Sequence, residues 1–379
     1  MHLTLILTAS LMAAAAEPTP AERAIAQAQQ GIAKDATHAE HHAHLALAYA
    51  RRARETADGK FYDEAERAAE KSLALAPNNF TALKARAWAL LGKREFVEAR
   101  HLAETLNKRM PDDLQVYGFL TDAYIELGQY DEAEKACNWM LRLRPGNTPA
   151  LTRAAQLREI FGDLDGALDL MSRAFQATPL NESEDRAWMM TQVAHLTLMR
   201  GDAARAEAML KEALVVFPGY HYALAALGQA RLARKDYAGA VESFRQRYEG
   251  APHAENLYDY AEALALSGQA AGAKKAFAEF ETKALAGSKA WDNSNRELVF
   301  YYANHARRPK EALKIAEFEY ARRQDVMTRD AYGWALYLNG RRTEAAAQYE
   351  AVKAVGLRDP KVLARAAKAG TLQRVSRAN

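Results

Sequence analysis

The stretch HAEHHAH at residues 38–44 holds four of the ten histidines in the chain. If this stretch is helical, His38 and His42 stand at positions i and i+4, and His41 and His44 stand at i and i+3. Each pair would then share a helix face, from which imidazole nitrogens could hold zinc or a similar cation. The four residues therefore raise the hypothesis of a metal-binding or metal-delivery protein. Whether the four imidazoles can share a metal depends on the helices that position them.

No catalytic motif accompanies these histidines. The sequence has no H-E-x-x-H, no G-x-S-x-G, no glycine-rich phosphate loop after a strand, and a single cysteine, Cys137. Its carboxylates are numerous, but on helices such residues are usually solvated or paired with lysine and arginine at i+4. We therefore expect no enzymatic activity, no catalytic residues and no cofactor. An enzyme of an unrecognised class stays open as an alternative.

Composition predicts a folded protein without an affinity for nucleic acid. The 379 residues are 49% hydrophobic and 26% charged, which allows a large core. The net charge of +3 is small for this length and gives no field that would attract phosphate backbones. Residues 361–379 carry five basic side chains and no acidic one. We interpret this segment as a C-terminal capping helix with a basic, solvated tail.

The N-terminus has the pattern of an export signal. The apolar run from Leu3 to Ala16 is too short to span a bilayer and ends in small residues before a polar, proline-containing segment. We predict a signal peptide at residues 1–16, a periplasmic or secreted location, and no integral membrane span after cleavage.

The chain repeats itself with a period of 34 residues. Pro111, Pro145 and Pro179 are spaced by this interval, and so are Pro218 and Pro252. In the clearest unit, residues 114–147, apolar residues recur at helical spacing, break at Gly128 and then resume until Pro145. This pattern predicts a helix, a turn marked by glycine, a second helix and a stop at proline.

Nine residues of this unit match the consensus of a known family. They are Tyr117, Leu120, Thr121, Tyr124, Gly128, Ala133, Cys137, Met140 and Pro145. The sequence thus resembles the tetratricopeptide repeat (TPR) family. Small residues at the eighth and twentieth repeat positions fit this pattern, because the two helices of a unit touch there.

The resemblance implies an all-α fold, a right-handed α-solenoid of about nine stacked helix pairs with capping helices at both ends. We place the solenoid at residues 38–360, with the strongest repeats at 114–252, and expect residues 17–37 to form a helix that packs on the first repeat. Seven surplus residues within the first repeat, in the segment RRARETADGKFY, should lengthen its helices or loop out.

Function in such an array belongs to a surface, since the fold has no catalytic cleft of its own. By resemblance, the partner-binding groove is lined by the first helix of each repeat. The candidate groove residues are Trp88, Asp122, Gln156, Trp188, His195, Tyr222, Gln229, Tyr258, Glu262, Tyr301, Asn304, Asp330, Trp334 and Tyr337. This mixture of aromatic and polar side chains is typical of protein-binding surfaces. We therefore predict a non-catalytic interaction scaffold or adaptor.

The groove positions lack the basic residues that would bind an acidic peptide end, and this limits the chemistry of the partner. Family members that grip a terminal carboxylate use lysine, arginine and asparagine in adjacent repeats. Here the equivalent positions carry Gln115, Asp122, Gln156 and Glu159, so an acidic C-terminal tail is not the expected ligand. We expect an extended peptide or a partner helix with basic and apolar character.

The repeat register also changes the interpretation of HAEHHAH. Thr37 and Glu40 have the spacing of a capping box, which predicts that a helix starts just before His38. His42 then falls at a packed repeat position, whereas His41 and His44 point elsewhere. This favours a polar entrance to the first repeat over a metal site.

Overall fold

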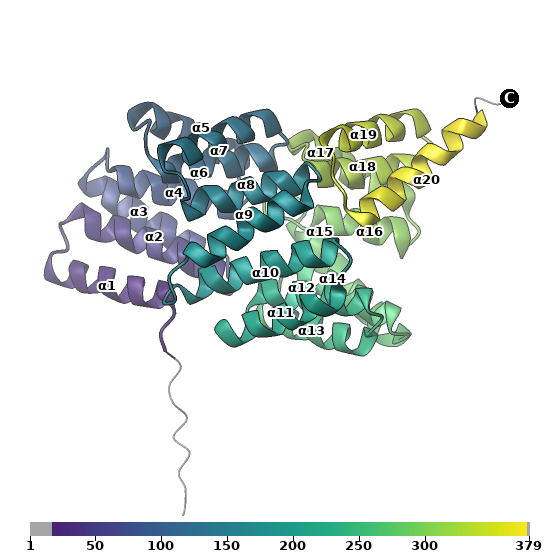
Figure 1. Cartoon of the computed structure of the whole chain (residues 1–379), viewed down its shortest axis with the longest axis horizontal. Coiled ribbons are helices and arrows are strands. Elements are labelled where there is room, and N and C mark those ends of the chain that lie inside the picture. Colours follow the sequence, from purple (N-terminus) through teal and green to yellow (C-terminus); the bar gives the residue numbers. More distant parts are fainter. Residues whose placement is uncertain (1–16, 377–379) are drawn as a thin grey trace, which may run out of the picture.

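The structure is a computed structural model that describes residues 17–376, with side chains described up to residue 370. The predicted signal peptide, residues 1–16, lies outside these residues. Twenty α-helices and no strands are found in the described part, which confirms the predicted all-α class (Figure 1). They are α1 (Pro20–Lys34), α2 (Ala39–Thr56), α3 (Lys60–Leu75), α4 (Phe80–Gly92), α5 (Phe96–Arg109), α6 (Leu114–Glu126), α7 (Tyr130–Leu143), α8 (Thr148–Ile160), α9 (Leu164–Ala177), α10 (Ser183–Met199), α11 (Ala203–Val216), α12 (His221–Ala233), α13 (Tyr237–Gly250), α14 (Ala254–Leu266), α15 (Ala270–Gly287), α16 (Asn295–Asn304), α17 (Pro309–Arg322), α18 (Val326–Leu338), α19 (Arg342–Val355) and α20 (Pro360–Ser376).

Helices α2 to α19 form nine antiparallel pairs that stack side by side. Small residues allow the two helices of each pair to approach closely. The twentieth repeat position is alanine in every pair and is buried each time, at Ala65, Ala99, Ala133, Ala167, Ala206, Ala240, Ala273, Ala312 and Ala345. At the eighth position of its pair, Gly228 leaves no room for a larger residue, because a Cβ atom there would lie 2.4 Å from the ring of Phe244.

The first pair is longer than the others and begins differently from the sequence prediction. Helices α2 and α3 have 18 and 16 residues, whereas α4, α6 and α8 have 13 each, so the surplus residues lengthen both helices. The predicted capping box is wrong. Helix α2 is capped by His38 without a side-chain bond, because the Thr37 hydroxyl donates instead to Asp35 Oδ1 at 2.7 Å.

Additional helices cover the two ends of the array. At the N-terminal end, α1 packs on α2, with Ala21 and Ala28 buried and the Ala21 N–H donating to Glu55 Oε1 at 2.9 Å. At the other end, α20 packs on α18 and α19 through Val362, Ala366 and Ala369. None of the helices in the described residues is long and apolar enough to pass through a bilayer.

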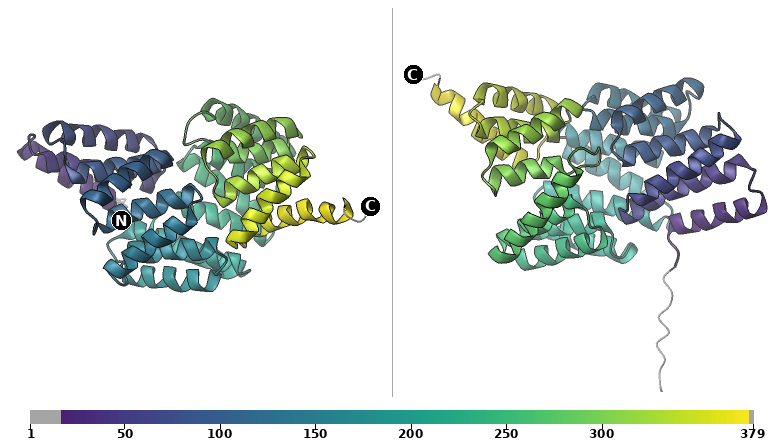
Figure 2. Two further views of the ribbon diagram at one scale, coloured as in Figure 1. Left: turned by 90° about the horizontal axis from the view of Figure 1, so that it is seen from above. Right: turned by 180° about the vertical axis from the view of Figure 1, so that it is seen from behind.

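The stack coils until early pairs contact late ones. The backbone N–H of Val326 donates to the Tyr130 hydroxyl at 2.9 Å, and the His253 ring is bonded to the Ala57 carbonyl; in both cases the partners are 196 residues apart. Figures 1 and 2 show the consequence, with α17 and α18 lying beside the ends of α6 to α8. The turns of the early pairs thus close one superhelical turn against the loops of the late pairs.

Two glycines allow this closure. Gly128 and Gly162 end helix-turn segments at φ +74° and +80°, and a Cβ atom on either would lie 2.6 Å from Gln324 O or 2.3 Å from Gly356 O. Both residues therefore need the left-handed backbone and also have no room for a side chain.

We expect Gly162→Ala to destabilise the protein more than Gly201→Ala. Gly201 also has a positive φ, +94°, but a Cβ there would meet nothing within 4 Å. Both substitutions should incur about 1–2 kcal/mol for the left-handed backbone, and Gly162→Ala a further 1–3 kcal/mol, roughly, for the clash. Chemical denaturation measures the difference. Equal losses would show that the contact with Gly356 contributes nothing to stability.

Candidate partner-binding channel

Three adjoining cavities lie on the inner side of the coiled array. The largest, of about 710 Å³, is lined by residues from α2 to α12 and shares Gln156 and Trp188 with a second cavity of about 340 Å³. It shares Arg54, Tyr62 and Tyr222 with a third cavity of about 430 Å³. We call the three cavities together the inner channel. It exists because the closed superhelix encloses the faces of the first helices of each pair.

The structure brings only part of the predicted groove residues to this channel. Six line it: Trp88, Asp122, Gln156, Trp188, His195 and Tyr222. The others, from Gln229 to Tyr337, line none of the three cavities. The inner channel is thus built mainly from the first half of the array.

Several candidates of the second half are structural. Tyr258 is buried, with its ring centroid 5.2 Å from that of Phe280, and its hydroxyl donates to Glu262 at 3.0 Å. Tyr301 is also buried and bonded to Glu281.

The candidate groove residues of the last repeat are also held by contacts within the protein. Trp334 is buried and donates its indole N–H to Asn304 Oδ1 at 3.0 Å, while its ring stacks on Tyr337. Asp330 is fully buried and paired with Arg365 of α20. The C-terminal helix therefore occupies the groove position of the last pair.

Other channel residues were missed in the sequence. Tyr62 comes from the second helix of the lengthened first pair. Phe119 and Gln192 come from positions of α6 and α10 that the repeat pattern does not assign to the groove. The repeat phase alone would not have found Tyr62, because it reaches the channel only through the additional residues of α2 and α3.

The acidic residues of the largest cavity are paired with arginines of the chain itself. Asp122 accepts two bonds from Arg153, at 2.8 and 2.5 Å. Arg153 can lie across α6 to reach it because Gly118 has no side chain: a Cβ there would be 3.0 Å from the guanidinium carbon. Glu182 is bonded to Arg51, and Asp185 to both Arg51 and Arg54. These carboxylates therefore offer little uncompensated charge to a basic ligand.

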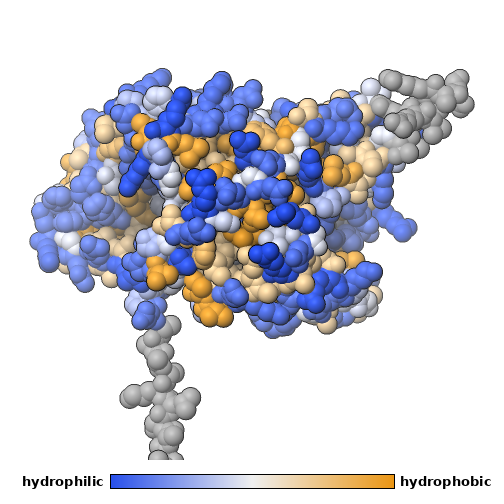
Figure 3. Space-filling model, in the orientation of Figure 1, coloured by the Kyte–Doolittle hydropathy of each residue, from blue (hydrophilic) through white to orange (hydrophobic). Residues whose placement is uncertain are grey.

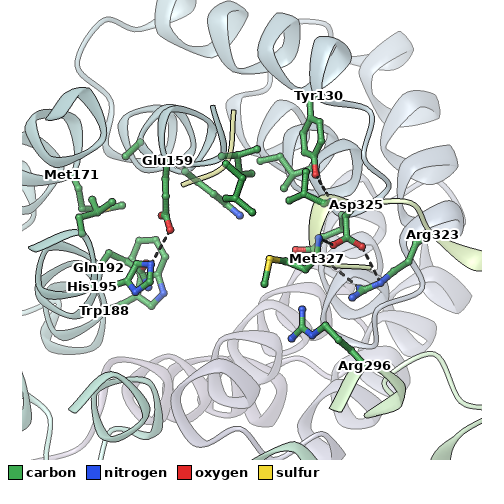
Figure 4. A pocket seen from close by; sticks show the side chains of 18 residues that line it. Tyr130, Glu159, Met171, Trp188, Gln192, His195, Arg296, Arg323, Asp325 and Met327 are labelled. Carbon is green, nitrogen blue, oxygen red and sulfur yellow. Dashed lines mark hydrogen bonds and ion pairs between the residues drawn. The ribbon is translucent and has the colours of Figure 1, made fainter. Parts of the chain in front are cut away.

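The second cavity has two walls of different origin. Figure 4 shows Trp188, Gln192 and His195 of α10 facing Met327 and the side chains around Asp325 across open space. Arg296 points into the cavity and donates two hydrogen bonds, at 3.1 and 3.2 Å, to its sequence neighbour Glu297. Early and late repeats thus contribute opposite walls.

Comparison with known proteins identifies the repeat. The tetratricopeptide repeat family model matches residues 90–150. Residues 90–150 are thus a tetratricopeptide repeat (TPR) segment, and the described helices have the fold of a TPR solenoid. A search of the curated proteins found no match.

Solved structures similar to this chain have the same fold. Human IFIT1, crystallised as a dimer with m7Gppp-AAAA, aligns over 87% of this chain and 85% of its own, with 14% identity and a TM-score of 0.56. A chain of the APC/C hetero-tetramer Cut9-Hcn1 aligns over 92% of this chain, with 14% identity and a TM-score of 0.54. The alignment spans 58% of that longer chain. At these identities the likeness concerns the fold alone.

One residue of the inner channel, His195, should respond to pH near neutrality. Burial lowers the pKa of His195, but the hydrogen bond to Glu159, 2.8 Å away, and the negative charges of Glu159 and Asp359 together outweigh burial and raise the pKa above its ordinary value. The pair therefore stabilises the fold fully below the unfolded pKa of about 6.5, and this contribution is lost as pH rises through the folded pKa.

We expect Glu159→Gln to lower the pKa of His195, because burial then acts against the charge of Asp359 alone. An NMR titration of the His195 ring measures the pKa directly. The stability difference between wild type and variant should be present at pH 5.5 and largely absent at pH 8.5. A difference that did not depend on pH would contradict this account.

The side chains of the four histidines in residues 38–44 do not converge on one point. His42 is buried, with its ring Nε2 2.9 Å from the Ala36 carbonyl oxygen. The His38 and His41 rings are tilted by 33° with their centroids 4.6 Å apart, and His44 is 3.7 Å from Glu40. In residues 17–376 no three His, Cys, Asp or Glu side chains stand where they could hold one metal ion. The structure thus gives no support to the metal-binding alternative.

Proposed function

We propose that this TPR protein is a non-catalytic scaffold that holds a segment of a partner protein in its inner channel. The family generally serves as a scaffold for protein–protein interactions. The observation that carries the proposal is the convergence of Trp88, Trp188, Tyr62 and Tyr222, from four different helix pairs, on one cavity of about 710 Å³. Aromatic side chains bury large areas on binding at a low entropic cost, and they are the usual anchors of such interfaces.

A protein segment suits the channel better than a nucleic acid. The human IFIT1 structures contain PPP-AAAA and m7Gppp-AAAA, whose phosphates carry several negative charges. A phosphate chain is held by cations that are free to pair with it. In the largest cavity the guanidinium groups of Arg54 and Arg153 are already engaged by Asp185 and Asp122.

Crosslinking in the native host, followed by mass spectrometry, tests the proposal. We expect Trp88→Ala and Trp188→Ala to reduce recovery of the partner at least tenfold, since aromatic anchors often contribute 2 kcal/mol or more, roughly. Trp139→Ala is the matched control, because Trp139 lies on α7, is 38% exposed and lines none of the three cavities. Equal recovery with all three variants would refute the channel as the binding site.

Export to the periplasm or the cell exterior is part of the proposal. It is supported by the apolar run from Leu3 to Ala16 and the small residues that end it. N-terminal sequencing of the protein recovered from its host should find the first residue close to position 17. An intact N-terminus would contradict export by this route.

A further inference from the structure

The groups in the largest cavity that lack partners are almost all uncharged. Within the described residues, no hydrogen bond engages the amides of Gln115 and Gln156 or the indole N–H groups of Trp88 and Trp188, although all four residues line this cavity. The same holds for the hydroxyl of Tyr62. Burial raises the pKa of this phenol, so the hydroxyl stays protonated and can donate.

The charged groups around them are compensated, as described above for Asp122, Glu182 and Asp185. A ligand that brought a further charge into this cavity would lose water without finding a free partner, which is costly. Arg54 is paired through its terminal nitrogen, but its buried Nε–H has no acceptor. That N–H can donate to a neutral carbonyl oxygen without changing the charge balance.

Three glutamine side-chain amides that have no hydrogen-bond partner within the described residues come from the first helices of three successive pairs. Gln115 is on α6, Gln156 on α8 and Gln192, in the adjoining cavity, on α10. Helix α6 contacts α8, α9 packs against both α8 and α10, and packed helices stand about 8–10 Å apart. An extended chain advances about 3.3 Å per residue, so the three amides match a peptide of about six residues.

A side-chain amide offers one acceptor and one donor group, which complement the N–H and C=O of a peptide unit. Hydrogen bonds to the main chain of an extended segment give affinity that does not depend on its side-chain charges. Pockets for individual side chains give the specificity. The cavity provides such a pocket between Trp88, Phe119 and Trp188.

We propose that the inner channel binds an extended, uncharged peptide segment of about six residues, with a large apolar or aromatic side chain lodged among Trp88, Phe119 and Trp188. This inference rests on the proposed function and adds the chemistry of the partner. It replaces the basic ligand expected from the sequence, because the carboxylates that suggested a basic ligand are neutralised by arginines of the chain.

Selection from a phage-displayed library of random dodecapeptides tests the inference on the full-length protein. We expect the selected peptides to share a core that lacks Asp, Glu, Lys and Arg and contains Trp, Tyr, Phe or Leu. A synthetic peptide of that core, blocked at both ends, should bind at least tenfold more weakly after Lys or Glu replaces a core residue next to the apolar anchor.

The variant Gln156→Leu/Gln192→Leu should also weaken binding of the blocked peptide at least tenfold. Its matched control is Gln29→Leu/Gln30→Leu, on the exposed side of α1, which should leave binding unchanged. Circular dichroism of each variant distinguishes lost binding from lost folding. Selected cores rich in acidic or basic residues would overturn the inference while leaving the channel as the binding site. Peptides that bind Trp188→Ala as well as wild type, or no selected peptide at all, would overturn both.

Discussion

Replacing Arg54 with methionine should destabilise the protein by about 3–5 kcal/mol, the usual cost of leaving a buried charge without its partner. Arg54 of α2 is bonded to Glu184 of α10, whose side chain is fully buried and also accepts from the Tyr220 hydroxyl. Burial raises the pKa of Glu184, and Arg54 acts against this effect. Without Arg54, this carboxylate must lose its charge or leave its site, and the contact between the first pair and the fifth pair should open.

Chemical denaturation measures the loss, and small-angle X-ray scattering should show a larger radius of gyration. Arg67→Met is the surface control, since Arg67 is 59% exposed and pairs with Glu64 in the same helix. The double variant Arg54→Met/Glu184→Gln should regain most of the stability, because no uncompensated charge is left. If Arg54→Met unfolded like the Arg67 control, the ion pair would have no role in closing the superhelix.

Replacing Arg365 with methionine should have an effect of similar size, about 3–5 kcal/mol, at the other end of the array. Arg365 of α20 donates to both carboxylate oxygens of Asp330, through Nε at 2.9 Å and through Nη2. Asp330 is fully buried in α18. Within the described residues its one arginine partner is Arg365 of the terminal helix, so losing it should release α20 and expose the last pair.

Hydrogen exchange should locate this change in α18, α19 and α20, while the early pairs keep their protection. Lys353→Met is a suitable control, because Lys353 is 49% exposed and pairs with the exposed Glu350 of the same helix. The double variant Asp330→Asn/Arg365→Met should restore part of the protection. Unchanged exchange in α20 would mean that its apolar residues, such as Val362 and Ala366, hold it without the ion pair.

The sequence was sufficient to predict the helix pairs but not their closure. Pairing depends on local contacts, which require small residues at fixed positions of the sequence, such as the alanines from Ala65 to Ala345. Closure depends on the small rotation of each helix pair relative to the next, which accumulates over several repeats. The sequence of a single repeat does not reveal the total rotation. The contact between Tyr130 and Val326, 196 residues apart, therefore had no local signature.

The same limit explains why the candidate site was predicted only in part. Trp88 and Trp188 were identified because their positions follow the repeat phase. The neutralisation of Asp122 by Arg153 could not be foreseen, since it depends on the space above Gly118. Thr37 shows the problem on a smaller scale. Its spacing from Glu40 fitted a helix cap, but the nearby Asp35 provided a competing acceptor.

The fixed separation of the closure contacts also bears on how the gene can change. In open arrays, whole repeats can be gained or lost, because each repeat touches only its neighbours. Here, duplication or deletion of one 34-residue unit between Tyr130 and Val326 would change their separation along the chain and displace the contact between them. Repeat number should therefore be constant in this segment among descendants of the gene, and units should be gained only outside it.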